Sequence, residues 1–413
     1  MTTSALPLFE PSAAPGPRGA LPADRALPAD VIAADGVDGA YIHVPFCRHK
    51  CHYCDFYSFV DRDDRQDAFA SRLIAEIESV APRWRRPLET IFVGGGTPTL
   101  LPPRIWQSLL PVLARRLPLA PGGEFTVEAN PETVSAELAE VLADGGVTRV
   151  SLGAQSFDRR HLATLERRHD PASVERSVDV LRRAGIREVN LDLIFGIPGQ
   201  RVEEWLRDLD LALALRPDHV SAYGLTYEPG TAMTMRLKLG EFTPADDEIE
   251  AAMFEATADR LAEAGFERYE ISNFARRDAL GARRCRHNML YWTNRDWWAF
   301  GPSASGHVRG VRWKNVPRLG DWLACSPWSP VIDVERLDAR GVSGERIMLG
   351  LRLSEGIEAI ELEGLLAVGK DAPERRAAFA RQVAAGLFER RGTRWALSRR
   401  GLLLANEVLA ELI

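Results

Sequence analysis

Six short β-rich runs alternate with longer amphipathic segments along the first half of the chain. The runs cover residues 40–44, 90–94, 125–129, 149–153, 189–195 and 220–224. Between them the apolar residues recur three or four positions apart, as within residues 66–80 and 174–184. Right-handed crossovers fold such strand–helix units into a parallel sheet with helices outside. Six units predict an α/β fold, a partial (β/α)6 barrel of the TIM type, with a doubly wound sheet as the alternative.

The chain divides into four parts by composition and pattern. Residues 1–36 are rich in Ala and Pro and have little apolar surface to bury, so we expect a disordered leader. Residues 37–275 hold the six repeats, and residues 276–340 form an aromatic-rich connecting region without one clean period. Residues 341–413 predict a small helical, winged-helix-like domain. Its expected helices cover residues 344–353, 376–385 and 401–412, with a short strand at 394–398.

Charge and cysteine content exclude several classes of protein. The chain has 58 acidic and 52 basic side chains and a formal charge of -6, so no excess of positive charge indicates a nucleic-acid partner. Its five cysteines are few and odd in number, which favours a reducing compartment. No basic and apolar leader of the secretory type is present, and no run of about 18 apolar residues predicts a transmembrane segment. We therefore expect a cytoplasmic protein.

Three cysteines follow the first predicted strand with the spacing C-x3-C-x2-C. They are Cys47, Cys51 and Cys54. Loops at the carboxyl ends of barrel strands gather active-site residues. Three thiolates can bind three irons of a cubane cluster and leave the fourth iron open to a ligand. Two alternatives are three buried thiols without a function, and a zinc site with one histidine as fourth ligand. The histidines near enough in sequence are His43, His49 and His52.

The sequence from Tyr41 through Cys47 and Cys54 to Phe56 resembles the radical S-adenosylmethionine (SAM) superfamily. Within it, the chain is similar to the group of oxygen-independent coproporphyrinogen oxidases and HemW haem chaperones, over most of its length after the leader. The resemblance implies a 4Fe-4S cluster on the three cysteines and SAM bound at the open iron. It also implies an electron donor, because reduction of the cluster splits SAM into a 5′-deoxyadenosyl radical.

A glycine run, Gly94–Gly96, and polar residues at later strand ends are the expected SAM contacts. Glycine permits the backbone to approach a ligand, and in the related family such a run lies against the methionine moiety of SAM. A carboxylate at a strand end can instead be a helix cap or an ordinary salt-bridge partner. The resemblance assigns SAM binding to Tyr41, Tyr53, Gly95, Gly96, Thr97, Glu128, Gln155, Arg167 and Asp192.

Phe56 bears on the choice between two functions. The related oxidases convert coproporphyrinogen III to protoporphyrinogen IX by radical decarboxylation, and they extend the motif to C-x3-C-x2-C-x-C. Here Phe56 stands at the position of the last cysteine. The departure favours a haem chaperone that delivers haem to an acceptor protein or respiratory enzyme.

Residues 285–292 contain the pattern H-N-x-x-Y-W that is associated with haem binding in HemW proteins. Imidazole can ligate haem iron, so His287 is the expected axial ligand, with Cys285 and His307 as competitors. The alternative is a core histidine beside an aromatic cluster. The expected walls of the site are Tyr291, Trp292, Trp297 and Trp298, and the expected partners of the propionates are Arg284, Arg286 and Arg295.

Overall fold

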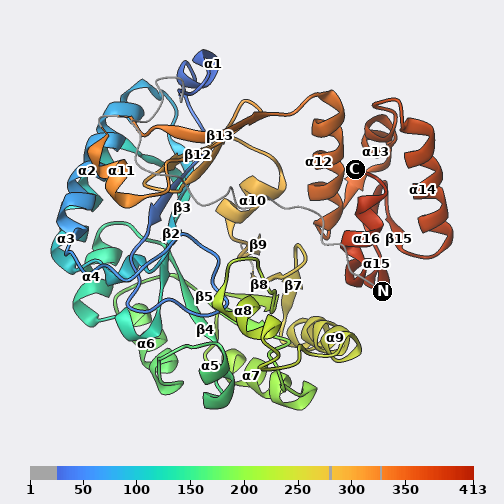
Figure 1. The fold of residues 1–413 in the computed structure, drawn as a ribbon, viewed down its shortest axis with the longest axis horizontal. Coiled ribbons are helices and arrows are strands. Elements are labelled where there is room, and N and C mark those ends of the chain that lie inside the picture. Colours follow the sequence, from blue (N-terminus) through green and yellow to red (C-terminus); the bar gives the residue numbers. More distant parts are fainter. Residues whose placement is uncertain (1–25, 279–280, 326–327) are drawn as a thin grey trace.

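The computed structural model describes residues 26–278, 281–325 and 328–413. Its centre is a curved sheet in which six strands pair in parallel with their neighbours in the chain (Figure 1). They are β1 (Gly39–Val44), β2 (Leu88–Gly95), β3 (Leu119–Ala129), β4 (Arg149–Gln155), β5 (Glu188–Phe195) and β6 (His219–Gly224). The strand order does not reverse, as it would in a doubly wound sheet. The predicted partial barrel is therefore confirmed.

Helices cover the outer face of the barrel (Figure 1). The expected helix over residues 66–80 is α2, in which Phe69, Leu73 and Ile77 are buried against the sheet. Burying one such side chain contributes roughly 1.5–3 kcal/mol. The other helices of this part are α3 (Pro103–Arg116), α4 (Ala136–Asp144), α5 (Arg159–Thr164), α6 (Ala172–Arg183), α7 (Val202–Ala214), α8 (Ala232–Lys238) and α9 (Asp247–Glu263). Short 3-10 turns cover Ala81–Arg83, Pro98–Leu100 and Pro131–Thr133.

Most of the expected connecting region, residues 276–340, extends the sheet at its β1 edge, while its first residues belong to strands at the β6 edge. Strand β10 (Trp297–Phe300) pairs in parallel with β1, and three antiparallel strands follow it. Trp298 and Trp313 are buried in the barrel core, which explains why these short strands belong to the sheet. The remaining elements here are β11 (Ser305–Val308), β12 (Val311–Asn315), β13 (Val331–Arg336), α10 (Arg286–Trp292) and α11 (Leu319–Ala324). At the β6 edge lie β7 (Phe266–Arg268), β8 (Asn273–Asp278) and β9 (Gly281–Ala282).

Residues 26–36 are folded, which corrects the expected end of the leader. They contain α1 (Ala29–Ile32), and Leu27, Val31 and Ala34 are buried in the barrel core. The apolar spacing of these three side chains lets one short turn bury all of them. The rest of the expected leader, residues 1–25, lies outside the described residues.

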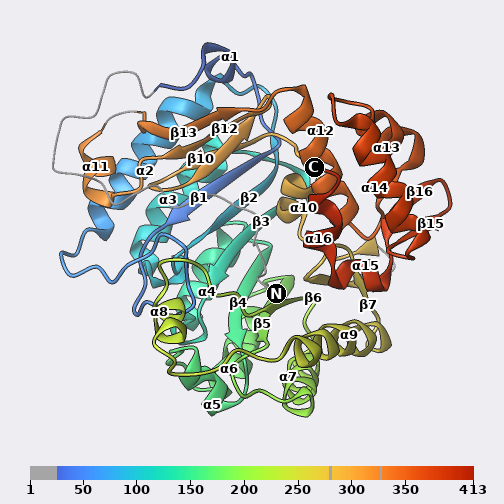
Figure 2. The ribbon, with the colours of Figure 1, turned by 45° about the vertical axis from the view of Figure 1, so that its right-hand side comes forward.

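The C-terminal part has a hydrophobic core of its own and lies beside the barrel, with α10 facing α12 (Figure 2). It forms the small helical domain with a wing that the sequence predicts. One expected helix, over residues 401–412, is divided at Leu404 into two. The elements are α12 (Ala339–Arg352), β14 (Ile357–Glu358), α13 (Ala359–Leu366), α14 (Ala372–Ala384), β15 (Phe388–Arg391), β16 (Arg394–Leu397), α15 (Arg399–Leu403) and α16 (Ala405–Ala410).

Among the helices of the described residues, none combines the length and the apolar composition that crossing a bilayer requires.

Candidate functional site

The three motif cysteines lie in a loop at the carboxyl end of β1. The base of this loop is closed where the backbone N–H of Cys47 donates to the Phe59 carbonyl at 2.9 Å and the Phe59 N–H donates to the Pro45 carbonyl at 2.9 Å. Within the loop the Cys54 N–H donates to the Cys51 carbonyl at 3.3 Å. All three thiols are free and partly exposed. The loop therefore presents unpaired sulfur ligands at the mouth of the barrel.

A line of polar contacts links two of these cysteines across the barrel mouth. The Cys47 Sγ lies 3.6 Å from the Thr97 hydroxyl, to which Asn130 Nδ2 donates at 2.9 Å. Arg167 donates from Nη2 to Asn130 Oδ1 at 2.8 Å and from Nη1 to Cys51 Sγ at 3.7 Å. The structure thus brings together four predicted site residues, Cys47, Thr97, Arg167 and Cys51, and a fifth, Asn130, that the sequence does not predict. Its position two residues after Glu128, just past the end of β3, was the available signal.

Burial and nearby cations set the protonation of the thiols. Burial raises the pKa of both Cys47 and Cys54. The Lys50 ammonium, 3.9 Å from Cys54 Sγ, opposes the rise. Iron binds the thiolate form, so a cation beside a partly buried thiol favours ligation.

Two of the three histidines that a zinc site would need are hydrogen-bonded elsewhere. His43 donates from Nε2 to the Tyr57 carbonyl at 2.7 Å and accepts at Nδ1 from the Tyr41 hydroxyl at 3.0 Å. Burial lowers the pKa of His43 to about 4. His52 Nδ1 accepts from Arg236 at 3.2 Å, and His49 Nε2 lies 3.6 Å from the Glu166 carboxylate.

The grouping of possible ligands bears on the choice between a single ion and a cluster. In the described part of the chain, no group of three or more His, Cys, Asp or Glu side chains converges on the position of one metal ion. In a cubane each thiolate binds a different iron, so the three sulfur atoms stand farther apart than around one zinc. Three thiols on one loop with cations beside them fit such a cluster.

Two half-buried carboxylates, Glu128 and Asp192, lie in the lumen below the cysteine loop. Glu128 Oε2 accepts the Gly95 N–H at 2.9 Å. Burial and the charge of Asp192 raise the pKa of Glu128 to about 7, and burial raises the pKa of Asp192. Burial raises the pKa of Tyr53, which lies in the cysteine loop. The charge of Asp192 adds to this rise, and the charge of Arg167 opposes it. Carboxylates with perturbed pKa values beside a metal-binding loop are typical of functional sites.

The glycine run packs the end of β2 against the cysteine loop. Gly95 has a φ of +105° and a Cβ there would collide with the ring of His43, while a Cβ on Gly96 would lie 2.7 Å from the Phe46 carbonyl. The Thr97 N–H donates to that same carbonyl at 2.7 Å. Close packing thus requires glycine here, and contact with SAM stays a prediction.

Gln155 ends β4 in an unusual conformation. Its φ of +63° lies in the left-handed region, and the pairing of β4 with β5 shifts register between Gly153 and Gln155. A non-glycine residue held there costs on the order of 1–3 kcal/mol and marks functional sites. A Cβ on Gly153 would lie 2.9 Å from Gln155 Nε2 and 3.2 Å from Arg167 Nη2. The bulge therefore aims Gln155 toward Arg167.

His287 lies at the opposite end of the barrel from the cysteines. Its Nδ1 is 2.7 Å from the Thr90 hydroxyl and its Nε2 is 2.8 Å from the Tyr291 hydroxyl, near the amino ends of β1 and β2. It is 1% exposed, stacks against Tyr41 and Phe92, and burial lowers its pKa to about 3. Both ring nitrogens are used, so ligation of haem iron by His287 requires one of these bonds to break.

The other residues expected around haem are also engaged. The buried Cys285 thiol donates to Glu124 at 3.5 Å, and burial raises its pKa. His307 Nδ1 donates to the Arg295 carbonyl at 2.9 Å. Arg295 and Arg286 pair with Glu89, and Arg284 pairs with Glu355. Trp297 contacts Tyr291 and His307, whereas Trp298 is buried in the core. A haem site at this segment is not preformed.

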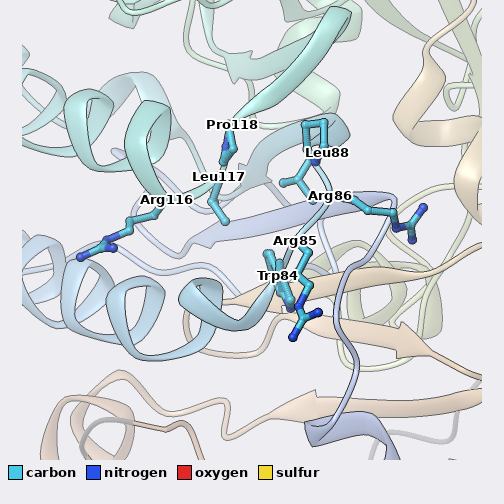
Figure 3. Close-up of a pocket in the computed structure, with 8 residues that line it drawn as sticks. Trp84, Arg85, Arg86, Leu88, Arg116, Leu117 and Pro118 are labelled. Atoms are coloured by element: carbon cyan, nitrogen blue, oxygen red, sulfur yellow. The ribbon is translucent and has the colours of Figure 1, made fainter.

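A hollow of about 130 Å³ lies at the amino ends of β2 and β3, far from the cysteine loop. Figure 3 shows that its three arginines, Arg85, Arg86 and Arg116, point in different directions. They do not converge on a common ligand. The hollow is therefore not part of the candidate site.

Family models and solved structures agree with this geometry. Residues 41–212 match the model of the radical SAM superfamily, and residues 343–404 match that of the HemN C-terminal domain. The fold is similar to that of coproporphyrinogen III oxidase (HemN) from Escherichia coli, a radical SAM enzyme, with a TM-score of 0.78 at 20% identity over 92% of this chain and 91% of that one. Fold and cysteine loop together define a radical SAM protein.

Two curated relatives show to which group of radical SAM proteins the chain belongs. The heme chaperone HemW of Mycobacterium tuberculosis is 38% identical over 381 residues, which cover 91% of this chain and 94% of the relative. The heme chaperone HemW of Bacillus subtilis is 34% identical over 382 residues, which cover 89% and 97%. The chain belongs to the HemW family of heme chaperones.

Proposed function

We propose that this protein is a cytoplasmic haem chaperone that carries a 4Fe-4S cluster and SAM. It binds haem and transfers it to an acceptor protein such as a respiratory enzyme. The observation that carries the cofactor assignment is the link from Cys47 through Thr97, Asn130 and Arg167 to Cys51, above two half-buried carboxylates. The haem assignment is supported by the name of the relatives that match about nine tenths of the chain.

Each group at the barrel mouth has a role in this proposal. Cys47, Cys51 and Cys54 bind three irons, and Lys50 favours the thiolate form of Cys54. Glu128 and Asp192 accept hydrogen bonds from the ammonium group and the ribose hydroxyls of SAM, and Tyr41, Tyr53, Gly95, Gly96, Thr97, Gln155 and Arg167 complete its site. When bound, the cluster and SAM supply one-electron chemistry, for which a separate electron donor is needed.

Phe56 supports a chaperone rather than an oxidase. Its side chain is 63% exposed and stands two positions after Cys54, where the oxidases have a further cysteine. A phenyl ring offers no ligand to a metal or a cluster. Solvent exposure of this large apolar group also indicates that it does not stabilise the loop by burial.

His287 remains the proposed axial ligand, with Cys285 and His307 as competitors. Ligation would replace the bond from Thr90 or from Tyr291 to the imidazole, so haem binding at this site entails movement of α10. Loss of one buried hydrogen bond costs roughly 1–3 kcal/mol, which an iron–imidazole bond can offset.

A side-by-side assay tests the proposal. Anaerobically reconstituted protein is titrated with haem and followed by the Soret band, and the same preparation receives coproporphyrinogen III, SAM and reductant. We expect saturable haem binding and no protoporphyrinogen IX. Product that depends on SAM and reductant, without haem binding, would instead establish the oxidase.

A further inference from the structure

A continuous line of hydrogen bonds, buried in its middle, runs from α10 to Asp192. Asn288 Nδ2 donates to the Tyr269 hydroxyl at 3.2 Å, and that hydroxyl lies 2.9 Å from His219 Nε2. His219 Nδ1 lies 2.7 Å from Asn190 Oδ1, and Asn190 Nδ2 donates to Asp192 Oδ1 at 2.8 Å. Tyr269, His219 and Asn190 are all buried. The line therefore connects α10, at the amino end of the barrel, to Asp192 in the middle of β5, and its three middle residues are out of contact with solvent.

The positions of the protons along this line follow from the Asp192 carboxylate, which accepts the last hydrogen bond. A carboxylate can only accept, so Asn190 turns its NH2 group to Asp192 and its oxygen to His219. An amide oxygen also only accepts, so His219 carries its proton on Nδ1 and accepts at Nε2 from Tyr269. The Tyr269 oxygen is then left to accept from Asn288. Burial lowers the pKa of His219 well below its usual value, which keeps the imidazole neutral.

Ser151 holds the second oxygen of the same carboxylate. Its hydroxyl accepts from Asn190 Nδ2 at 2.6 Å and donates to Asp192 Oδ2 at 2.8 Å. Asn190 and Ser151, which bond to each other, thus each hold one oxygen of Asp192, and Ser221 contacts both Asn190 and Asp192. Asn190 in turn is oriented by His219.

We propose that Tyr269 and His219 are positioning residues that hold the Asp192 carboxylate ready for SAM, and that Asn288 connects this control to α10. The inference rests on the proposed function, in which Asp192 contacts SAM. A side chain that is already ordered loses less conformational entropy on binding than a mobile one. Releasing Asp192 should therefore weaken SAM binding without removing any group that touches SAM.

The Tyr269→Phe variant tests this with the loss of a single oxygen atom. Calorimetry on cluster-loaded protein is expected to show about three- to tenfold weaker SAM binding. His219→Leu should have a similar effect, and His219→Gln should restore affinity, because its amide can donate to Asn190 and accept from Tyr269. Thr257→Val, which breaks the buried 2.8 Å bond to Trp205 outside this line, is the matched control and should leave SAM affinity unchanged.

A double-mutant cycle separates positioning from a general loss of stability. In an Asp192→Asn background the Tyr269→Phe substitution should change SAM affinity less than about twofold, because its effect passes through the carboxylate. Equal weakening in both backgrounds would overturn the inference. So would full SAM affinity in Tyr269→Phe when Asp192→Asn weakens binding. Wild-type cluster-loaded protein that binds no SAM would instead refute the proposed function.

Nitrogen-15 NMR of labelled histidines gives a second readout that does not involve SAM. At neutral pH His219 should be a neutral imidazole with its proton on Nδ1. A proton on Nε2, or a charged ring, would contradict the assigned line of donors regardless of any binding result.

Discussion

Glu128 and Asp192 lie close enough in the barrel lumen that the Asp192 charge, together with burial, raises the pKa of Glu128 to about 7. Two neighbouring, half-buried carboxyl groups resist ionising together, so near neutral pH this lumen lacks part of its negative charge. A cationic ligand such as a sulfonium or ammonium group would favour ionisation of both. Binding of a cationic ligand at this site should therefore lower the pKa of both carboxyl groups.

Stability of the protein without cofactors should depend on Glu128 in a defined pH range. The pKa of this carboxyl is about 4.5 in the unfolded chain and about 7 in the folded one. Its stabilising contribution is therefore complete below pH 4.5 and is lost as the pH rises through 7. The shift corresponds to a loss on the order of 3 kcal/mol. Denaturant unfolding of wild type and Glu128→Gln should show the variant gaining relative stability from pH 5 to pH 8; a constant difference would contradict the assignment.

Replacement of Cys47, Cys51 or Cys54 by Ser should abolish cluster assembly. Hydroxyl groups are poor ligands for iron in a cubane, and loss of one of three protein ligands leaves two irons open. Iron and sulfide analysis after anaerobic reconstitution measures the effect, with Cys325→Ser as the control because Cys325 lies outside the loop. One tightly bound zinc and no cluster in the wild type would favour the zinc alternative.

Asn130→Ala should damage the site although Asn130 is not a proposed ligand. It removes both the donor to Thr97 and the acceptor for Arg167, each bond contributing about 1 kcal/mol or more. We expect roughly tenfold weaker SAM binding with the cluster still assembled. Asn406→Ala, which removes a surface contact to Arg352 in the C-terminal part, is the control. Unchanged SAM affinity in Asn130→Ala would show that Asn130 has no part in the site.

Tyr291→Phe should strengthen haem binding if His287 is the axial ligand. The substitution keeps the ring and removes the hydroxyl that occupies His287 Nε2, so the nitrogen becomes available to iron. A Soret titration of wild type, Tyr291→Phe and His287→Ala measures the change. Equal haem affinity and identical spectra in all three proteins would exclude His287 and direct attention to Cys285 and His307.

The sequence predicts the six barrel strands and α2 because each has a strong local period and a buried face. It does not predict β10 to β13, since these strands are short and their place beside β1 depends on aromatic packing, as at Trp298 and Trp313. Local composition does not predict that residues 26–36 are folded for a similar reason: Val31 is buried only because the barrel provides a surface for it.

The sequence predicts the residues expected to bind cofactors at the candidate site. It does not predict the residues that position them. The cysteine spacing and the strand ends identify Cys47, Glu128 and Asp192. The role of Asn130 depends on two contacts with residues 33 and 37 positions away, which no local pattern encodes. The place of His287 depends likewise on long-range bonds: Glu124 accepts from the backbone N–H groups of Arg286 and His287 and so fixes the start of α10 at the amino end of the barrel.

That position of α10 closes the amino end of the barrel. At its amino end Thr90, Glu124, Arg149 and His287 are all buried, so in the described residues this end is sealed by side chains. A molecule bound beside Glu128 and Asp192 is therefore closed off from the amino end, and the cysteine loop lies over the opposite, carboxyl end. A group bound on the cysteine loop would therefore cover a ligand bound beside Glu128 and Asp192. The fold would in this way affect the order in which the two bind.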